Sequence, residues 1–142
     1  MSDVLEVKTI TLEAARRAVT ACVERARGLG VAVAIAVTDQ GGNLKAFARM
    51  DGAPLLSSRI AQDKAWTAAA FGLATHEWWD RVKDEPPLLH GLVKTEGLIV
   101  FGGGVPLRVG GELVGGIGVS GATADQDRQI AEAGAVAITG AR

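Results

Sequence analysis

Val114-Gly-Gly-Ile-Gly-Val-Ser-Gly-Ala-Thr-Ala124 combines alternating glycines and branched apolar residues with a helix start signal. Within it, Gly116-x-Gly118-x-x-Gly121 has the spacing of a dinucleotide-binding fingerprint, which brings a pyrophosphate to a helix N-terminus. That fingerprint needs a second strand and an acidic residue about 20 residues further on, but the remaining chain reads as one helix. Two aspartates in the first turn of this helix would repel a phosphate. We therefore interpret the segment as a strand with one smooth side, against which a helix or a flat ligand lies.

The rest of the chain predicts helices and strands in a simple order. Apolar residues recur at helical spacing from Leu12 to Ala26, and the segments 59–73 and 124–138 are also predicted to be helical. Short helices are expected between Thr75 and Lys94. The predicted strands cover residues 31–37, 44–50, 98–101, 105–109 and 112–119. Because several strands are joined by tight turns, we expect an α/β (α+β) fold with a mainly antiparallel sheet and helices on both faces.

Composition restricts the class of protein. The 142 residues are expected to form one domain, residues 1–142, that buries its own core. Fifteen basic and sixteen acidic residues give a net charge of −1, which predicts no nucleic-acid partner. No apolar run approaches a membrane span and no secretory signal is evident, so we expect a cytoplasmic protein. Many small residues and few aromatic ones favour further burial through a homo-oligomer.

Several motifs in order resemble one known family. They are Val37-Thr-Asp-Gln-Gly-Gly-Asn-Leu44, Ala48-Arg-Met-Asp-Gly-Ala53, Lys64-Ala-Trp-Thr-Ala68, Gly103-Gly-Val-Pro-Leu107 and Gly115-Gly-Ile-Gly-Val-Ser-Gly121 followed by Asp127. Together they resemble the GlcG/HbpS-like proteins, a family that includes the C-terminal domain of PduO-type proteins and is often labelled haem-binding or haem-degrading. The resemblance runs from about Thr9 to Ile138.

The resemblance implies a profilin-like fold with a five-stranded antiparallel sheet, and usually an oligomer. It also implies haem as a candidate cofactor, with a histidine on the first helix as one iron ligand. This chain departs from that pattern, because residues 12–27 contain no histidine. His76, His90 and the hydroxyl of Thr123 are the candidate substitutes.

Lys64 is the main candidate for chemistry, because it lies on a helical stripe of small and apolar residues. A partly desolvated lysine has a lowered pKa and suits a base, a Schiff-base amine or an anion anchor, whereas a snorkelling lysine keeps its ammonium in water. Arg49 and Asp51 flank a strand exit, where Asp51 either stabilises a turn or moves a proton. Gly102, Gly103 and Gly104 form either a bulged turn or a concavity of N–H groups for an anion.

Three functions follow from these candidates. The first is a binding protein for a small or flat ligand, with haem as the named candidate, in a pocket of the Arg49–Asp51 loop, Lys64 and the glycines 102–104. The second is a cofactor-independent enzyme of small-molecule catabolism, a lyase, isomerase or hydrolase that acts on an organic acid through Lys64 and Asp51. The third is a non-catalytic accessory oligomer. Two histidines without a metal-binding spacing give no reason to expect a metal site.

Overall fold

The computed structural model describes residues 2–138 as a four-stranded sheet between helices. In chain order the elements are α1 (Leu12–Leu29), β1 (Ala34–Asp39), β2 (Leu44–Arg49), α2 (Ser57–Phe71), the 3-10 helix Thr75–Glu77, α3 (Trp78–Val82), α4 (Pro86–Leu92), β3 (Gly104–Val109), β4 (Glu112–Ser120) and α5 (Ala124–Val136). The strand order is β2-β1-β4-β3, and each neighbouring pair is antiparallel. The expected class, an antiparallel sheet with helices on both faces, is confirmed.

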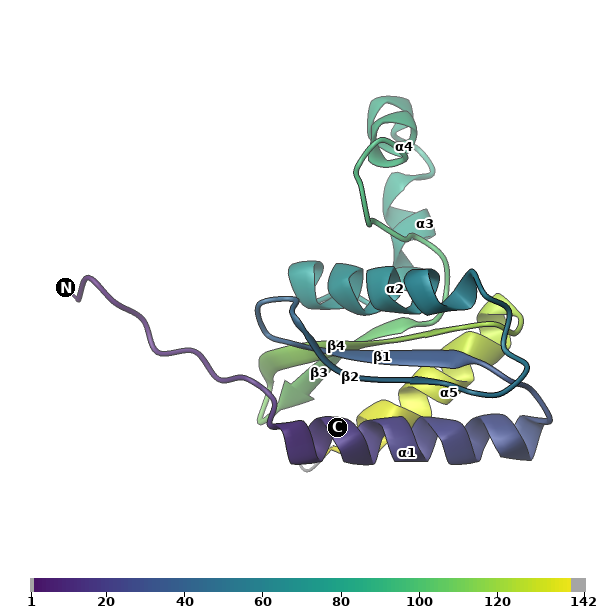
Figure 1. The fold of residues 1–142 in the computed structure, drawn as a ribbon. Helices are drawn as coiled ribbons and strands as arrows, with labels where there is room; N and C mark the ends of the chain where they lie inside the picture. The colour runs from purple at the N-terminus through teal and green to yellow at the C-terminus, as the bar shows by residue number, and fades with distance from the viewer. Residues whose placement is uncertain (1, 139–142) are drawn as a thin grey trace.

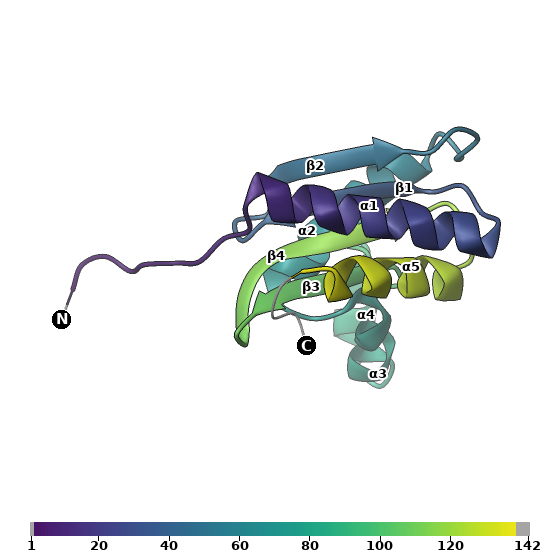
Figure 2. The ribbon, with the colours of Figure 1, turned by 90° about the horizontal axis from the view of Figure 1, so that it is seen from below.

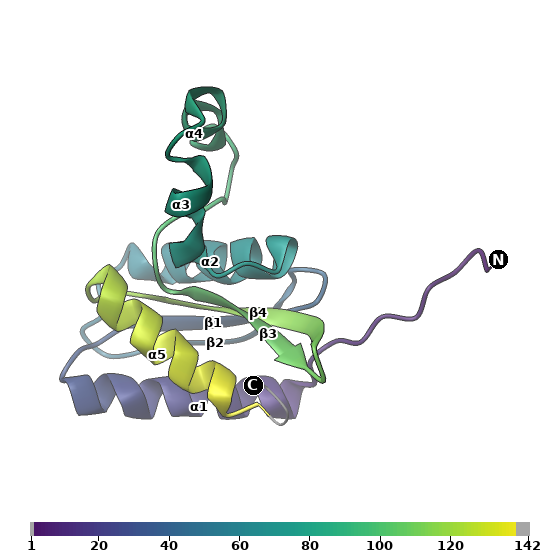
Figure 3. The same ribbon diagram turned by 180° about the vertical axis from the view of Figure 1, so that it is seen from behind.

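The helices divide between the two faces of the sheet. α2 covers one face, and α1 and α5 cover the other (Figure 1). Seen from below, α1 lies over β1 and β2 while α5 lies over β3 and β4 (Figure 2). α3 and α4 project away from the sheet beyond α2, as the view from behind also shows (Figure 3). Within residues 2–138, no helix combines the length and apolarity needed to cross a bilayer.

β1 is the central strand that its alternating sequence predicts. Ala34 and Ala36 are fully buried beside Ala61 and Ala65 of α2. Ile35 and its neighbours at alternate positions point to the opposite face, into the core under α1 and α5. Because alanine side chains are small, α2 can approach this face of the sheet closely.

The glycines of β4 also allow α2 to lie close to the sheet. They form the smooth side of the strand that the sequence predicts. A Cβ atom on Gly118 would clash with the backbone oxygen of Ala61, and one on Gly116 would clash with that of Ala65. This smooth side is therefore covered by the backbone of α2. The glycine spacing that imitates a dinucleotide fingerprint is a requirement of close helix–sheet packing.

The predicted five-stranded sheet is corrected to four strands in the described residues, because residues 98–101 form no strand. The backbone N–H of Ile99 donates to the hydroxyl of Thr67 on α2 at 3.0 Å, and that of Leu98 donates to the carbonyl of Thr95. These bonds satisfy groups that a strand would offer to a neighbour. The segment therefore runs along α2 as an irregular connection to β3.

Candidate functional site

The end of β2 opens into a hollow of about 430 Å³ between this edge strand and α1. It is lined by Val23, Arg27, Ala48, Arg49, Met50 and Asp51, and we call it the arginine hollow. The N–H of Met50 donates to the carbonyl of Val33 at 3.0 Å, and the Met50 side chain packs against the core. Neither arginine nor Asp51 forms an ion pair within the described residues. The lining of the hollow is thus mainly polar and includes two arginines that form no ion pair in the described chain, which suits an anion.

Lys64 lies on the other side of the sheet and is buried, with 1% of its side chain exposed. Its Nζ donates to the carbonyl oxygen of Val119 at 2.8 Å and to Oδ2 of Asp127 at 3.2 Å. The other carboxylate oxygen of Asp127 accepts from the N–H of Ala122 at 3.0 Å. The ring of Phe101 lies 5.0 Å from Nζ and closes the remaining side. The ammonium therefore lies in neither water nor an open pocket.

Burial lowers the pKa of Lys64, and the charge of Asp127 and its hydrogen bond oppose that shift. This pair joins α2 to the start of α5 and to the end of β4. The stripe of small residues correctly indicates burial of Lys64, but its partner lies 63 positions away and is missed by the sequence reasoning. In the sequence, the only indication of this partner is that Asp127 belongs to one of the family motifs.

Gly103 and Gly104 lie against Lys64, whereas Gly102 lies against the backbone of Ala124. A Cβ atom on Gly103 would lie 2.6 Å from the Nζ of Lys64, and one on Gly104 would lie 2.6 Å from the Lys64 carbonyl oxygen. Gly103 also has a φ of +124°, which favours glycine. The N–H of Gly104 donates to the hydroxyl of Thr75 at 2.8 Å, so it is not free to hold an anion. Gly103 and Gly104 thus allow this segment to pack closely against Lys64.

The two histidines lie in different surroundings. His76 is half-buried, and its Nδ1 has no hydrogen-bond partner among the residues that the structure describes. Burial lowers the pKa of His76, and the positive charge of Arg128 lowers it further. His90 lies exposed on α4, a projecting helix without buried residues.

The structure brings some of the candidate residues together and separates others. Lys64 meets Gly103 and Gly104, but Arg49 and Asp51 belong to the arginine hollow at the edge of the sheet. In residues 2–138, no hydrogen bond or ion pair joins Lys64 to Asp51. The same region contains no cluster of three or more histidine, cysteine, aspartate or glutamate side chains suited to a metal ion.

Comparison with known proteins identifies the family. A family model described as haem degrading protein HbpS-like matches residues 10–136. The chain belongs to the HbpS-like family. Among curated relatives of this HbpS-like chain, an uncharacterised 15.0 kDa protein from the dhaT-dhaS intergenic region of Citrobacter freundii is 39% identical over 134 residues, 93% of this chain and 94% of the relative. Protein GlcG of Escherichia coli is 36% identical over 97 residues, 68% of this chain and 70% of the relative.

The corrinoid adenosyltransferase PduO of Salmonella typhimurium is 42% identical over 119 residues, which are 83% of this chain. The HbpS-like chain spans only 35% of that relative. It therefore corresponds to one part of PduO.

Solved structures confirm the fold of this HbpS-like chain. Protein ORFY of Klebsiella pneumoniae matches with a TM-score of 0.91 and 34% identity, over 97% of this chain and 96% of that protein. HbpS matches with a TM-score of 0.85 and 38% identity, over 94% and 93%. A complex of PduOC with haem matches with a TM-score of 0.82 and 36% identity, over 92% and 95%.

Proposed function

We propose that this HbpS-like chain binds haem, with the arginine hollow holding the propionate groups. The observation that carries the proposal is the likeness to the PduOC chain that was solved with haem, at 36% identity and a TM-score of 0.82. The description of the family as haem degrading supports the same class of ligand.

The residues of the hollow fit this ligand at its charged and its apolar ends. Arg27 and Arg49 are cations without an ion-pair partner in the described chain, and guanidinium groups bind carboxylates in a bidentate manner. Val23 and Ala48 supply apolar contact. When bound, the haem iron would supply redox and ligand-binding chemistry, and the protein sets its axial ligand and surroundings.

In this proposal Met50 would hold the haem iron. α1 supplies no histidine to the hollow, although the family resemblance implied one on that helix, whereas Met50 offers a thioether, an iron ligand in cytochromes c. Cys22 is fully buried, and burial raises the pKa of its thiol to about 12, so it is a poor ligand. The chain has no tyrosine. His76 is the alternative ligand, since its Nδ1 lacks a partner in residues 2–138.

The catalytic alternative has less support. A reaction through Lys64 requires the loop at residues 102–104 to open, because the Lys64 side chain is 1% exposed and its ammonium is bonded to Asp127. Asp51 would then have to act from a separate hollow. PduO is named as a corrinoid adenosyltransferase, but this chain spans only 35% of that protein.

Titration of the purified protein with haemin, followed by absorbance, tests the proposal. We expect a saturable Soret shift at one haemin per chain, altered in Met50→Leu and retained in His76→Gln and His90→Gln. Cobalamin serves as a second ligand, because the relative PduO is named for corrinoid chemistry. A featureless haemin titration would refute haem binding, and loss of the shift in His76→Gln alone would move the iron ligand to His76.

A further inference from the structure

Residues 2–9 form an extended arm that leaves the body of the protein (Figures 1, 2 and 3). Val4, Leu5 and Val7 on this arm are 75%, 89% and 67% exposed. No backbone–backbone hydrogen bond involves residues 2–9 in the described chain. The N–H of Val4 donates to the hydroxyl of Ser2 at 3.3 Å. An extended segment whose backbone groups lack backbone partners and which carries clustered apolar side chains is a template for pairing with another strand.

The base of the arm is fixed to the sheet. The N–H of Ile10 donates to the carbonyl of Val114 at 3.0 Å, and the hydroxyl of Thr9 accepts from the N–H of Gln40 at 3.0 Å. Lys8 lies 3.5 Å from the carboxylate of Glu112. The arm therefore leaves the body in a defined direction.

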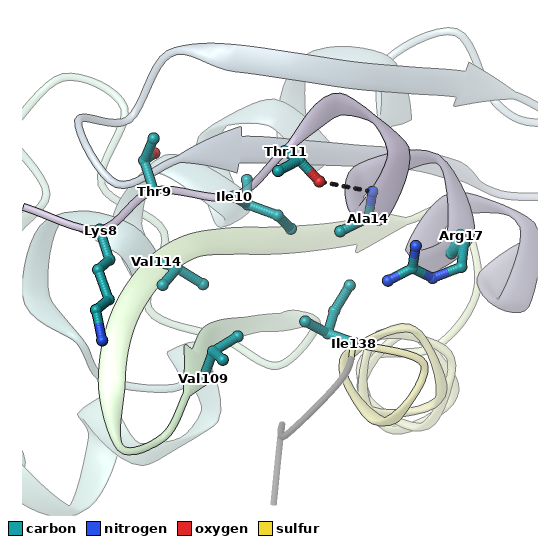
Figure 4. A pocket seen from close by; sticks show the side chains of 9 residues that line it. All are labelled: Lys8, Thr9, Ile10, Thr11, Ala14, Arg17, Val109, Val114 and Ile138. Carbon is teal, nitrogen blue, oxygen red and sulfur yellow. Dashed lines mark hydrogen bonds between the residues drawn. The ribbon is translucent and has the colours of Figure 1, made fainter.

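An apolar hollow of about 350 Å³ lies beside this base. In Figure 4 the side chains of Ile10, Val109, Val114 and Ile138 converge on the open space. Arg17 points toward the same space and forms no ion pair within residues 2–138. The hollow thus offers apolar walls and one available positive charge.

We propose that two copies of this chain pair through their arms as antiparallel strands, with Val7 opposite Val7 on the two-fold axis. In this register Glu6 of each arm lies opposite Lys8 of the other, and Val4 lies opposite Ile10. Val4 shares a face with Ile10, so it meets the apolar hollow of the second copy. Asp3 comes opposite Thr11, on the wall that also carries Arg17. Each contact occurs twice, as a two-fold interface requires.

The charges favour this register over the two symmetric registers next to it that centre on a charged residue. A shift that centres the pair on Glu6 places two carboxylates opposite each other, and a shift that centres it on Lys8 does the same with two ammonium groups. Like charges directly opposite are destabilising, whereas opposite charges are favourable. The arm is therefore complementary to a second copy of itself in one register. This inference is independent of haem binding.

Cysteine cross-linking tests the register. Val7→Cys places two thiols opposite each other at a Cα separation of about 5.5 Å, within the range of a disulfide. Asp3→Cys is the matched control on the same arm, because its two copies would lie about 26 Å apart in this register. Cys22 is buried and does not compete. We expect Val7→Cys to oxidise to a covalent dimer about 100-fold faster than Asp3→Cys. Equal rates, or a chain that stays single, would overturn the proposal.

A charge exchange tests the ion pairs in a Val7→Cys background that also carries Glu112→Gln, because that change removes the Lys8–Glu112 contact within one chain. Glu6→Lys and Lys8→Glu should each slow the cross-linking, because they place like charges opposite each other. The two exchanges together should restore the rate. Failure of the double exchange to restore it would contradict the proposed register.

Discussion

Replacement of Lys64 by methionine should destabilise the protein strongly. The change leaves the Asp127 carboxylate, which is 4% exposed, without its ammonium partner and with the N–H of Ala122 as its remaining hydrogen bond. Removal of one member of a buried pair typically costs about 3–5 kcal/mol. For a chain of this size that loss corresponds to a decrease of about 10–17 °C in Tm.

Urea unfolding followed by circular dichroism measures this cost for Lys64→Met, for Asp127→Asn and for the double variant. The side-chain amide that Asp127→Asn introduces is neutral and can still accept from the N–H of Ala122, so the double variant should recover about 2 kcal/mol relative to the sum of the single changes. Lys45→Met, at an exposed position on β2, is the control and should stay within about 0.5 kcal/mol of the wild type. A loss below about 1 kcal/mol for Lys64→Met would refute a stabilising ion pair and return Lys64 to the candidates for chemistry.

Two further predictions concern packing and pH. Gly118→Ala should lower the free energy of unfolding by about 1–3 kcal/mol, because its Cβ would clash with the backbone of α2. Gly28→Ala, which has open space around it, should be neutral or stabilising in thermal unfolding. Equal effects of the two changes would contradict the close packing of α2 on β4. The pKa of His76 is lowered from 6.5, so the unfolded chain binds more protons just below that pH, and the free energy of unfolding should fall as the pH falls below 6.5. Urea titrations at pH 5 to 8 should show a weaker fall for His76→Gln, and an unchanged slope would exclude His76 as its source.

The parts of the fold that local sequence determines were predicted well. The cap of α1 at Thr11 and the capping box of Thr123 and Gln126 are present. The two apolar faces of residues 31–37 correctly placed that strand at the centre of the sheet. Residues 98–101 have the composition of a strand, but the hydroxyl of Thr67 takes the N–H of Ile99. A local sequence pattern cannot show that a side chain more than 30 positions away accepts the hydrogen bond that a neighbouring strand would otherwise accept.

The candidate site was predicted less well for a related reason. Burial of Lys64 follows from its stripe of small residues, but the identity of its partner depends on how β4 meets α5. Arg49 ends and Asp51 follows a strand that proved to be an edge of the sheet, which separates them from Lys64. The sequence could indicate that Lys64, Arg49 and Asp51 are candidates for a site. Which of them lie together depended on the order of the strands in the sheet.

The affinity for haem and for its dimethyl ester, measured on the wild type and on the Arg27→Gln/Arg49→Gln variant, tests the central claim most directly. The ester lacks the carboxylates that the two arginines are proposed to hold. We expect the variant to raise the Kd for haem about tenfold and to leave the Kd for the ester unchanged. Lys45→Gln, a cation on the same strand but outside the arginine hollow, should alter neither value. Equal losses for haem and ester, or no loss for either, would contradict binding of the propionates in this hollow.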